Sequence, residues 1–194
     1  MPDDQAAAKA DARRLLRARR RQVTADERAM ASRQAAQHLI EAMACSLPAT
    51  VAVFAALAEE IDTGPLIEGL RARQCAIALP RQVRPGEALA LHLAAPDMAL
   101  VPGPFGVPEP PAAAPLAHPQ IIVVPFLGYD LKGNRLGYGA GFYDRTLAQW
   151  RAARPDLKAI GFGYALQWMD ALPAGPFDQT LDGICTELGF TWIR

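Results

Sequence analysis

The residues best suited to chemistry lie in one segment, residues 133–145, which reads GNRLGYGAGFYDR. It combines closely spaced glycines with arginines, aromatic residues and a carboxylate. The apolar run at residues 121–125 precedes it and predicts a buried strand, and Tyr143, Leu147 and Trp150 follow at helical spacing. Glycines between a strand and a helix often bind phosphate, because the backbone can approach an anion closely and the first helical N–H groups point at it. The segment therefore predicts a phosphate-binding turn.

This segment does not fit the common phosphate motifs. A P-loop needs Gly-Lys-Ser/Thr, which does not occur, and the dinucleotide fingerprint would need a glycine at Phe142. A tight loop without a ligand is the plainer alternative for any glycine-rich turn. The full string, however, closely resembles the ATP-binding signature of the 5-formyltetrahydrofolate cyclo-ligase family. That resemblance implies ATP binding by Asn134, Arg135, Leu136, Gly137, Tyr138, Gly139, Ala140, Gly141, Phe142 and Tyr143.

Two positions in the segment depart from the family's usual pattern. Phe142 stands where tyrosine is common, so stacking on a ligand is retained but a hydrogen bond from that hydroxyl is lost. Ala140 stands where some members have lysine, so other cations must meet the phosphate charge. Arg135 and Arg145, within the segment, are the expected ones.

A second candidate group is basic and lies near the N-terminus. Lys9, Arg13, Arg17 and Arg20 recur at spacings of four, four and three, so they share one face of a helix. This pattern alone is compatible with a solvated basic face and with a nucleic-acid-binding arm. The resemblance implies a sharper role, because family members carry a Lys and an Arg four apart that reach the ATP phosphates. Lys9 and Arg13 match that pair. Together with Arg135 and Arg145 of the glycine-rich segment, they are the cations expected to take part in catalysis. The remaining arginines are expected mostly to face water.

Acidic residues follow the strand predicted at residues 50–55. Glu59 and Glu60 stand at its carboxyl end, the edge where open α/β sheets bind ligands. They could simply precede a helix cap at residues 62–63. The string EIDT at residues 60–63 resembles a family stretch whose Glu contacts the reduced pterin, and a carboxylate can accept paired N–H donors. Further pterin contacts implied by the resemblance are Ala55, Phe105, Tyr138, Phe142 and Tyr143, and the segment at residues 103–110 resembles the family's loop over the substrate.

Aspartates are the candidates for binding a metal. Asp144 stands in the first turn of the predicted helix, where a lone Asp usually only favours the helix dipole. Beside a nucleotide it is a natural Mg²⁺ ligand, since Mg²⁺ takes one or two carboxylates plus phosphates and water. Asp178 resembles the family's second metal-linked Asp, with Asp182 as a substitute. The resemblance thus implies ATP and Mg²⁺ as cofactors.

The rest of the composition argues against several other classes. The three histidines and three cysteines show no metal spacing, and neither serine sits in a nucleophile elbow, which argues against zinc and hydrolase chemistry. Twenty basic and twenty acidic residues cancel, so no global field draws the chain to nucleic acid or membrane. No secretory or membrane-spanning stretch is present. We expect a cytoplasmic protein that acts on small molecules, without a nucleic-acid, membrane or obligate protein partner, and with its cysteines in the core.

Predicted helices and strands alternate along the 194 residues. The helices cover residues 5–22 and 24–45 and begin again after 62 and 142, and Thr24 with Glu27 forms a capping box. The strands cover residues 50–55, 75–79, 89–93, 121–124, 157–161 and 191–193, with a proline-dense loop at 102–119. This order predicts an α/β single-domain three-layer fold over residues 1–194, with a mostly parallel central sheet flanked by helices and two N-terminal helices.

The resemblance implies a specific reaction. It is the ATP- and Mg²⁺-dependent cyclisation of 5-formyltetrahydrofolate to 5,10-methenyltetrahydrofolate, with release of ADP and phosphate through an imidate phosphate intermediate. The lack of an obvious nucleophile agrees with catalysis by positioning and charge stabilisation. The alternative is a basic-helix RNA-binding protein without catalysis.

Overall fold

The centre of the structure is a seven-stranded sheet in the order β11-β10-β9-β6-β1-β2-β3. The computed structural model describes residues 2–193, and only the backbone of residues 2–4 and of Phe105. The parallel strands are β10 (Gly183–Thr186), β9 (Lys158–Phe162), β6 (Ile121–Val124), β1 (Thr50–Ala52) and β2 (Ala76–Arg81). The edge strands β3 (Ala90–Leu93) and β11 (Gly189–Trp192) run antiparallel to their neighbours. The predicted mostly parallel sheet is confirmed.

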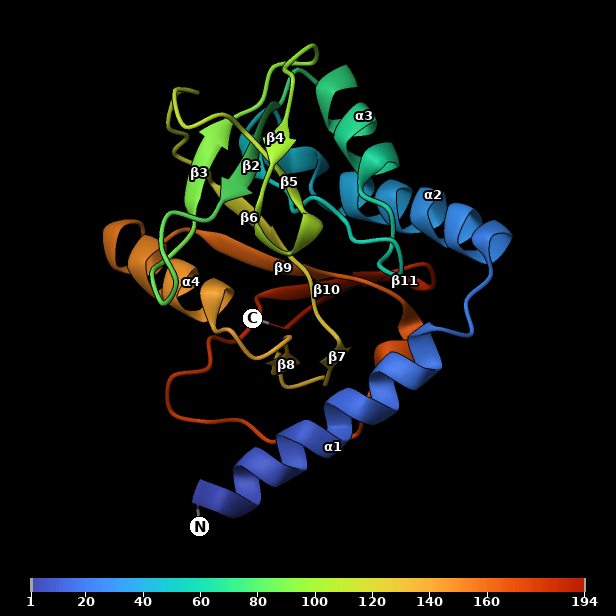
Figure 1. The fold of residues 1–194 in the computed structure, drawn as a ribbon. Coiled ribbons are helices and arrows are strands. Elements are labelled where there is room, and N and C mark those ends of the chain that lie inside the picture. The colour runs from blue at the N-terminus through green and yellow to red at the C-terminus, as the bar shows by residue number, and fades with distance from the viewer. Residues whose placement is uncertain (1, 194) are drawn as a thin grey trace.

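Helices cover both faces of this sheet (Figure 1). Helices α2 (Ala25–Ala42) and α3 (Gly64–Ala72) pack on one face, and α4 (Phe142–Ala153) packs on the other. In β6, Ile121 and Val123 join the core beneath α2 and α3, whereas Ile122 and Val124 join the core beneath α4. Successive side chains of a strand point to opposite faces, so a strand between two helix layers is apolar throughout. The three predicted layers are confirmed.

Helix α1 (Pro2–Arg20) lies outside these layers, at the edge of the sheet where the parallel strands end (Figure 1). Leu16 is fully buried and packs in a cluster with Leu127, Leu136 and Leu172. Leu136 belongs to a small hairpin made of β7 (Gly128–Tyr129) and β8 (Arg135–Leu136). Apolar burial therefore holds α1 against the hairpin that leads into the glycine-rich segment.

Several elements differ from the sequence-based expectation. The glycine-rich segment does not follow β6 directly, because the β7–β8 hairpin intervenes. Strand β10 was not predicted, and β1 ends at Ala52 rather than Ala55. The proline-dense loop contains a second short pair, β4 (Val101–Pro102) and β5 (Pro108–Glu109), beside the 3₁₀ turn η2 (Pro104–Gly106). Strands of two residues are too short to show the period-2 pattern by which strands are recognised.

The caps of α2 and α3 form in different ways. The capping box of α2 is confirmed, since the Glu27 N–H donates to Thr24 Oγ1 at 3.3 Å and the Thr24 N–H to Glu27 Oε2 at 2.8 Å. At α3, the hydroxyl of Thr63 instead donates to the Phe54 carbonyl at 2.9 Å, and Asp62 Oδ1 accepts the Gly64 N–H at 3.0 Å. These bonds tie the start of α3 to the end of β1 and fix the loop between them.

The cysteines agree only in part with the expected core positions. Cys75 and Cys185 are buried, whereas Cys45 is exposed at the turn η1 (Ala44–Ser46).

Across residues 2–193, no helix combines the length and the apolar character needed to cross a membrane.

Candidate active site

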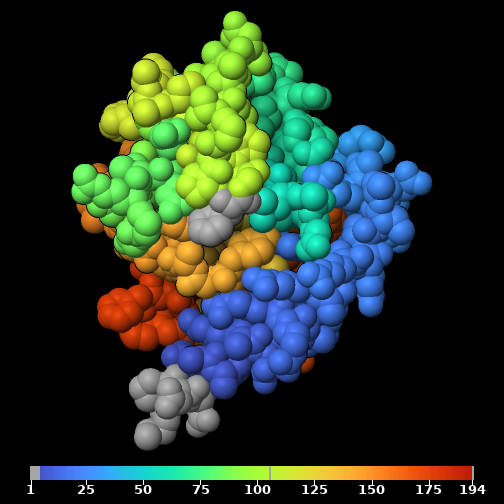
Figure 2. Space-filling model, in the orientation of Figure 1, coloured from blue at the N-terminus to red at the C-terminus, as the bar shows by residue number. Residues whose placement is uncertain are grey.

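A pocket of about 520 Å³ opens at the carboxyl edge of the parallel strands. Phe54 and Ala55 follow β1, Pro125 follows β6, and Pro80 lies near the end of β2, so three strand ends contribute to its wall. Open α/β sheets bind their ligands at this edge. In Figure 2 the glycine-rich segment, in light orange, lies between the green and yellow-green loops above it and the blue helix α1 below it.

The pocket gathers most of the residues that the sequence singled out. Those that line it are Lys9, Arg13, Ala55, Glu60, Asp178 and all of residues 135–144. They come from α1, the loop after β1, the glycine-rich segment and the segment before β10. Residues far apart in the sequence thus meet at one place.

The glycine-rich turn adopts backbone conformations that favour glycine. Gly139 (φ +109°) and Gly141 (φ +68°) both lie in the left-handed region. A side chain at Gly141 would also meet the Arg145 guanidinium, which lies 2.8 Å from the position of a Cβ atom. Gly141 is the N-cap residue of α4 and makes no side-chain cap. The N–H groups of the first turn have no partner inside the helix, so they are available to an anion in the pocket.

Two cations of α1 reach this turn. The Arg13 Nε donates to the Gly137 carbonyl at 2.9 Å. One turn earlier, Lys9 Nζ pairs with Asp178 Oδ2 at 2.6 Å, and the same oxygen accepts the Gly175 N–H at 2.7 Å. Both side chains are partly buried, and a charge shielded from water acts more strongly on a nearby anion. The N-terminal half of the basic face of α1 is therefore turned toward the pocket.

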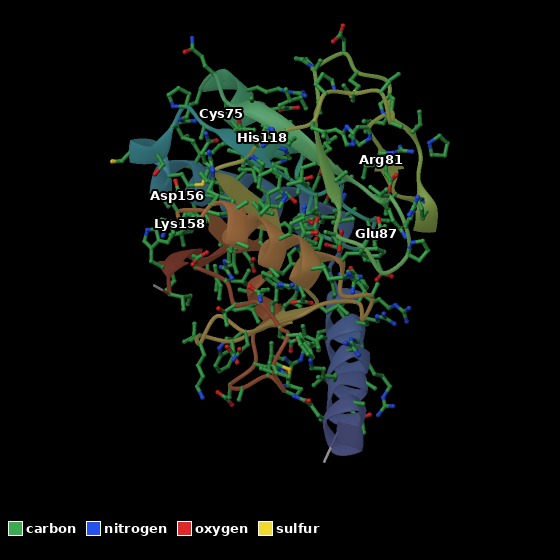
Figure 3. The ribbon with its side chains drawn as sticks, turned by 90° about the vertical axis from the view of Figure 1, so that its left-hand side faces the viewer. Cys75, Arg81, Glu87, His118, Asp156 and Lys158 are labelled. Atoms are coloured by element: carbon green, nitrogen blue, oxygen red, sulfur yellow. The ribbon has the colours of Figure 1, made fainter. Side chains whose placement is uncertain are left out.

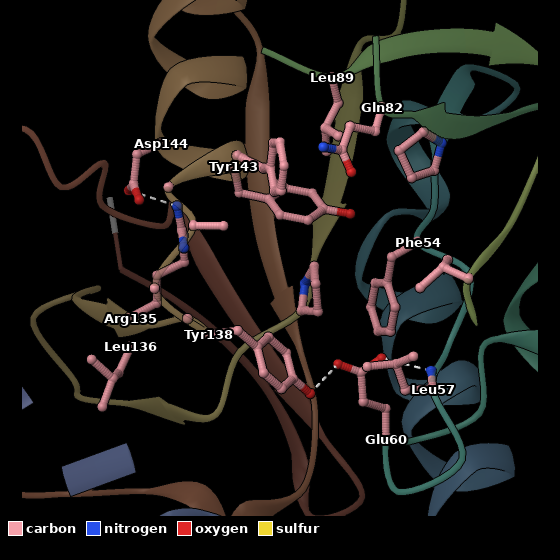
Figure 4. A pocket seen from close by; sticks show the side chains of 18 of the residues that line it. Phe54, Leu57, Glu60, Gln82, Leu89, Arg135, Leu136, Tyr138, Tyr143 and Asp144 are labelled. Carbon is pink, nitrogen blue, oxygen red and sulfur yellow. Dashed lines mark hydrogen bonds and ion pairs between the residues drawn. The ribbon is translucent and has the colours of Figure 1, made fainter. Parts of the chain in front are cut away.

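A second ion pair lies inside the glycine-rich segment. Arg135 Nη2 donates to Asp144 Oδ1 at 2.6 Å, and that oxygen also accepts the Gln179 N–H at 3.0 Å (Figure 4). Burial lowers the pKa of the Arg135 guanidinium, and the Asp144 carboxylate opposes this shift. The pair links β8 to the first turn of α4 and holds a third cation beside the turn.

The two pocket carboxylates on the side of the cations, Asp144 and Asp178, fit a magnesium ion shared with a nucleotide. Asp144 and Asp178 are each held through one oxygen by the contacts above. Residues 5–193 contain no cluster of three or more His, Cys, Asp or Glu suited to a metal, and Mg²⁺ commonly takes one or two carboxylates with phosphates completing its shell. Asp182 is less suitable, because it pairs with Arg151 at 2.7 Å and accepts the Ala159 N–H at 2.8 Å away from the pocket.

Glu60 lies on the opposite side of the pocket from Arg135 and Asp144, beside Tyr138 of the glycine-rich turn (Figure 4). It is buried, and its Oε1 accepts the Tyr138 hydroxyl at 2.6 Å while Oε2 accepts the Leu57 N–H at 2.8 Å. Burial raises the pKa of Glu60, and these two hydrogen bonds oppose the shift. Phe54 and Tyr143 present aromatic rings to the same pocket (Figure 4). A flat ligand with N–H donors on one edge suits such a combination.

One wall of the pocket comes from two loops, of which the sequence singled out only the segment at residues 103–110. The β2–β3 loop and the proline-dense loop supply Gln82, Leu89, Pro104, Val107 and Glu109. Glu109 is 6% exposed, accepts the Gln82 N–H at 3.0 Å and pairs with Arg81 at 3.6 Å. The resemblance pointed to the loop at residues 103–110, but no signal in the sequence singled out the Glu109 carboxylate itself or the β2–β3 loop.

Three residues expected in the site are not placed in the pocket. Asn134 Nδ2 donates to Asp130 at 2.9 Å, outside the lining. Arg145 also lies outside the lining and donates to a carbonyl of the glycine-rich turn at 2.6 Å and to the Glu87 carbonyl at 3.3 Å. It therefore ties the turn to the β2–β3 loop, which lies beside α4 (Figure 3). The side chain of Phe105 lies outside the described part of the structure.

The arrangement offers two binding chemistries side by side. Cations and free helical N–H groups on one side suit a polyanion such as a nucleotide triphosphate. A buried carboxylate and aromatic rings on the other side suit a flat heterocycle. No covalent nucleophile is needed to bring the two ligands together for reaction.

Sequence comparison links the chain to one family of enzymes. The model of the 5-formyltetrahydrofolate cyclo-ligase family matches residues 5–187. The 5-formyltetrahydrofolate cyclo-ligase of Escherichia coli K12 is 31% identical over 178 residues, which cover 89% of this chain and 96% of that protein. The protein of the same name from Haemophilus influenzae is 30% identical over 167 residues, which cover 84% and 88%.

Solved structures show the same likeness. The NMR structure of 5,10-methenyltetrahydrofolate synthetase from Aquifex aeolicus superposes with a TM-score of 0.75 at 28% identity, covering 96% of this chain and 93% of that one. A 5,10-methenyltetrahydrofolate synthetase from Mycoplasma pneumoniae gives a TM-score of 0.73 at 20% identity, covering 92% and 98%. The second likeness supports the fold alone.

Proposed function

The chain belongs to the 5-formyltetrahydrofolate cyclo-ligase family, and we propose that it uses ATP with Mg²⁺ to cyclise 5-formyltetrahydrofolate to 5,10-methenyltetrahydrofolate, releasing ADP and phosphate. One observation carries the proposal. A single pocket joins the glycine-rich turn and its cations to a buried carboxylate between aromatic rings. The first group suits a triphosphate and the second suits a pterin, which are the two parts that must meet in this reaction.

The chemistry proceeds in two steps on the substrates. The formyl oxygen attacks the γ-phosphorus of ATP, the bond to ADP breaks, and an imidate phosphate forms. The nitrogen N10 then bonds to the activated carbon, the carbon–oxygen bond breaks, phosphate leaves and the N10 proton is released. Phosphoryl transfer gathers negative charge on the phosphate oxygens, so fixed cations around them lower the barrier without covalent catalysis.

The residues divide between the two substrates. Lys9, Arg13 and Arg135 neutralise and orient the phosphates, together with the first N–H groups of α4. Asp144 and Asp178 would hold Mg²⁺, which when bound supplies further positive charge beside the phosphates.

The pterin lies on the other side of the pocket in this proposal. Glu60 accepts N–H donors from it, and Phe54 and Tyr143 pack on its rings. We place the activity in the cytoplasm, because three unpaired cysteines suit a reducing compartment.

The RNA-binding alternative loses part of its support. Lys9 and Arg13 are turned toward the pocket and bound to Asp178 and Gly137, so this part of the basic face of α1 is not presented to an external partner. Retention on RNA that falls steeply with salt would revive the alternative.

One assay tests the function directly. The protein is mixed with 5-formyltetrahydrofolate and Mg²⁺, and the absorbance of the methenyl product is followed with and without ATP. We expect product only when ATP is present, and one ADP for each product formed. Product without ATP, or none with it, would refute the proposal.

Removal of the Arg13 side chain should weaken ATP use. A charge-assisted bidentate contact is worth about 1.5–3 kcal/mol, so Arg13→Ala should raise the KM for ATP about tenfold or more. The fold should survive, because Arg13 is only partly buried and makes one hydrogen bond within the protein. Initial rates at varied ATP, with the melting temperature of each variant, measure this.

Arg19→Ala is the matched control for Arg13→Ala. Arg19 belongs to the same helix, is exposed, and makes only a 3.3 Å bond to the Trp168 carbonyl away from the pocket. Its KM for ATP should stay within about twofold of the wild type. Equal effects of the two substitutions would mean that Arg13 acts through general charge and not through the phosphates.

A further inference from the structure

Arg20, in the last turn of α1, is a buried cation. The expectation that the remaining arginines face water is wrong for this residue, which is 3% exposed. Its Nη1 donates to the Tyr138 hydroxyl at 2.6 Å, and its Nη2 donates to Glu59 at 3.3 Å. Arg20 does not line the 520 Å³ pocket. It reaches the site through Tyr138 and through a longer ion pair, in which its Nη1 lies 3.9 Å from Glu60 Oε1.

These contacts form a hydrogen-bonded chain with a fixed direction. A guanidinium can only donate, so the Tyr138 oxygen must accept from Arg20. The hydroxyl proton of Tyr138 is then directed at Glu60 Oε1, 2.6 Å away. The other oxygen of Glu60 accepts the Leu57 N–H. Glu60 thereby receives two donors and keeps its remaining lone pairs as acceptors for a ligand in the pocket.

Packing alone does not hold the Tyr138 side chain in this position. Tyr138 is 37% exposed and lies between the pocket and an outer cavity of about 330 Å³ that Arg17 and Arg21 also line. The guanidinium carbons of Arg17 and Arg20 lie 5.7 and 5.5 Å from the ring centroid, a range in which cations attract aromatic rings. Because the outer cavity leaves room for the ring to turn away, the hydrogen bonds of the hydroxyl to Arg20 and Glu60 are what fix it.

We propose that Arg20 is a positioning residue which, through Tyr138, holds Glu60 as an ionised hydrogen-bond acceptor and so sets the preference for a substrate edge that carries N–H donors. The inference rests on the proposed function, since a reduced pterin has such an edge. If this hydrogen-bonded chain is broken, the Glu60 carboxylate loses a donor and protonates more readily. The added proton then faces the N–H donors of the substrate edge, which is an unfavourable contact. The phosphates of ATP are held by Lys9, Arg13 and Arg135, and Tyr138→Phe keeps the ring that the resemblance implies for ATP binding, so the affinity for ATP is unaffected.

Two substitutions test the chain with little change of shape. Tyr138→Phe removes only the hydroxyl, and Arg20→Lys keeps the positive charge but loses the two-pronged donor. Each should weaken the binding of 5-formyltetrahydrofolate, measured by calorimetry without nucleotide, by about tenfold. The affinity for ATP should change by less than about twofold. Arg14→Lys is the control, because Arg14 is exposed on the same helix and pairs only with Asp11.

The pH profile separates positioning from a general loss of structure. The ionisable groups that act on Glu60 are Arg20 of α1, Arg28 of α2, Tyr138 and Tyr143, with Glu59 beside it. In both variants, the pH below which folate binding weakens should be higher than in the wild type. The proposal would be overturned by a variant that binds folate more weakly at every pH but whose binding falls off at the same pH as that of the wild type.

The double variant gives the sharpest result. If Arg20 acts through Tyr138, Arg20→Lys adds little to the loss already caused by Tyr138→Phe. The proposal would be overturned if the losses of folate affinity in the two single variants multiply in the double variant, as independent effects do. Intact folate binding in Tyr138→Phe would also overturn it. Should Arg20→Lys fail to fold, Tyr138→Phe alone still decides. A wild-type protein that binds the folate without cyclising it would refute the proposed function and leave this test in force, whereas a wild type that does not bind it would overturn both.

Discussion

Asp144→Asn should reduce turnover by about a hundredfold or more while the protein remains folded. The change keeps the shape of the side chain but removes the charge that would hold Mg²⁺ beside the phosphates. Loss of one electrostatic contact to the developing charge typically costs on the order of 10²–10³ in rate, and the metal neutralises the charge that builds during phosphoryl transfer. Turnover at saturating substrates and the Mg²⁺ concentration needed for half-maximal rate measure the effect.

Two structural roles of Asp144 must be separated from this one. If it only favoured the dipole of α4, the substitution would cost about 0.3–1 kcal/mol of stability and leave turnover intact. Asp144 also pairs with the buried Arg135 at 2.6 Å, and removal of one partner of a buried pair can cost about 3–5 kcal/mol. That figure is an upper bound here, because the Asp144 side chain is 23% exposed. The melting temperature must therefore be measured together with turnover.

Asp182→Asn provides the matched control for Asp144→Asn. Asp182 also pairs with an arginine, at 2.7 Å, and also accepts a backbone N–H, but it lies outside the pocket. We expect both variants to lose stability and only Asp144→Asn to lose turnover. If Asp144→Asn keeps its turnover, the residue is an anchor for Arg135 and Asp178→Asn becomes the next test of the metal site.

The fold could be predicted where a signal is local. The run IIVV of β6 is buried on both faces and therefore continuous in the sequence. The capping box at Thr24 satisfies N–H groups within four residues, so its pattern is complete in the sequence. The hairpin β7–β8 and the pair β4–β5 have strands of two residues each, and contacts with distant segments decide whether such short stretches pair.

The candidate site shows the same difference between local sequence signals and contacts with distant segments. The glycine-rich turn and the Lys9–Arg13 pair are visible because each depends on near neighbours in the chain. The resemblance pointed to the segment at residues 103–110, but Glu109 itself and the β2–β3 loop beside it were missed, since their positions depend on the paths of two loops across the sheet edge. Asp178 needed the structure for a similar reason, because only the fold separates it from Asp182 by bringing it to Lys9. Sequence motifs thus identify some residues of a site more readily than the residues on the opposite wall of the pocket.

Glu60→Gln should weaken folate binding by about tenfold or more and leave ATP binding nearly unchanged. The amide replaces one acceptor by a donor, and a donor that faces another donor costs about 1–3 kcal/mol when buried. In this protein the replacement faces a donor in either orientation, because one oxygen meets the Tyr138 hydroxyl and the other meets the Leu57 N–H. Calorimetry with each substrate separates the two affinities.

Glu59→Gln is the control for Glu60→Gln. Glu59 is the adjacent carboxylate, its side chain is 45% exposed, and it pairs with Arg20 and Arg21 outside the pocket. Its substitution should leave folate binding within about twofold of the wild type. If Glu60→Gln binds folate normally, Glu60 serves only to order the loop before α3.

The dependence of folate binding on pH should show whether the Glu60 charge itself is used. Burial raises the pKa of Glu60 above its ordinary value, against the opposing effects of Tyr138, the Leu57 N–H, Arg20 and Arg28. As pH falls through this raised pKa, the carboxylate gains a proton and can no longer accept two N–H donors, so wild-type affinity should fall on the acidic side. Glu60→Gln cannot titrate and should lack that fall, while Glu59→Gln should keep it. A fall that persists unchanged in Glu60→Gln would assign the titration to the folate and not to the enzyme.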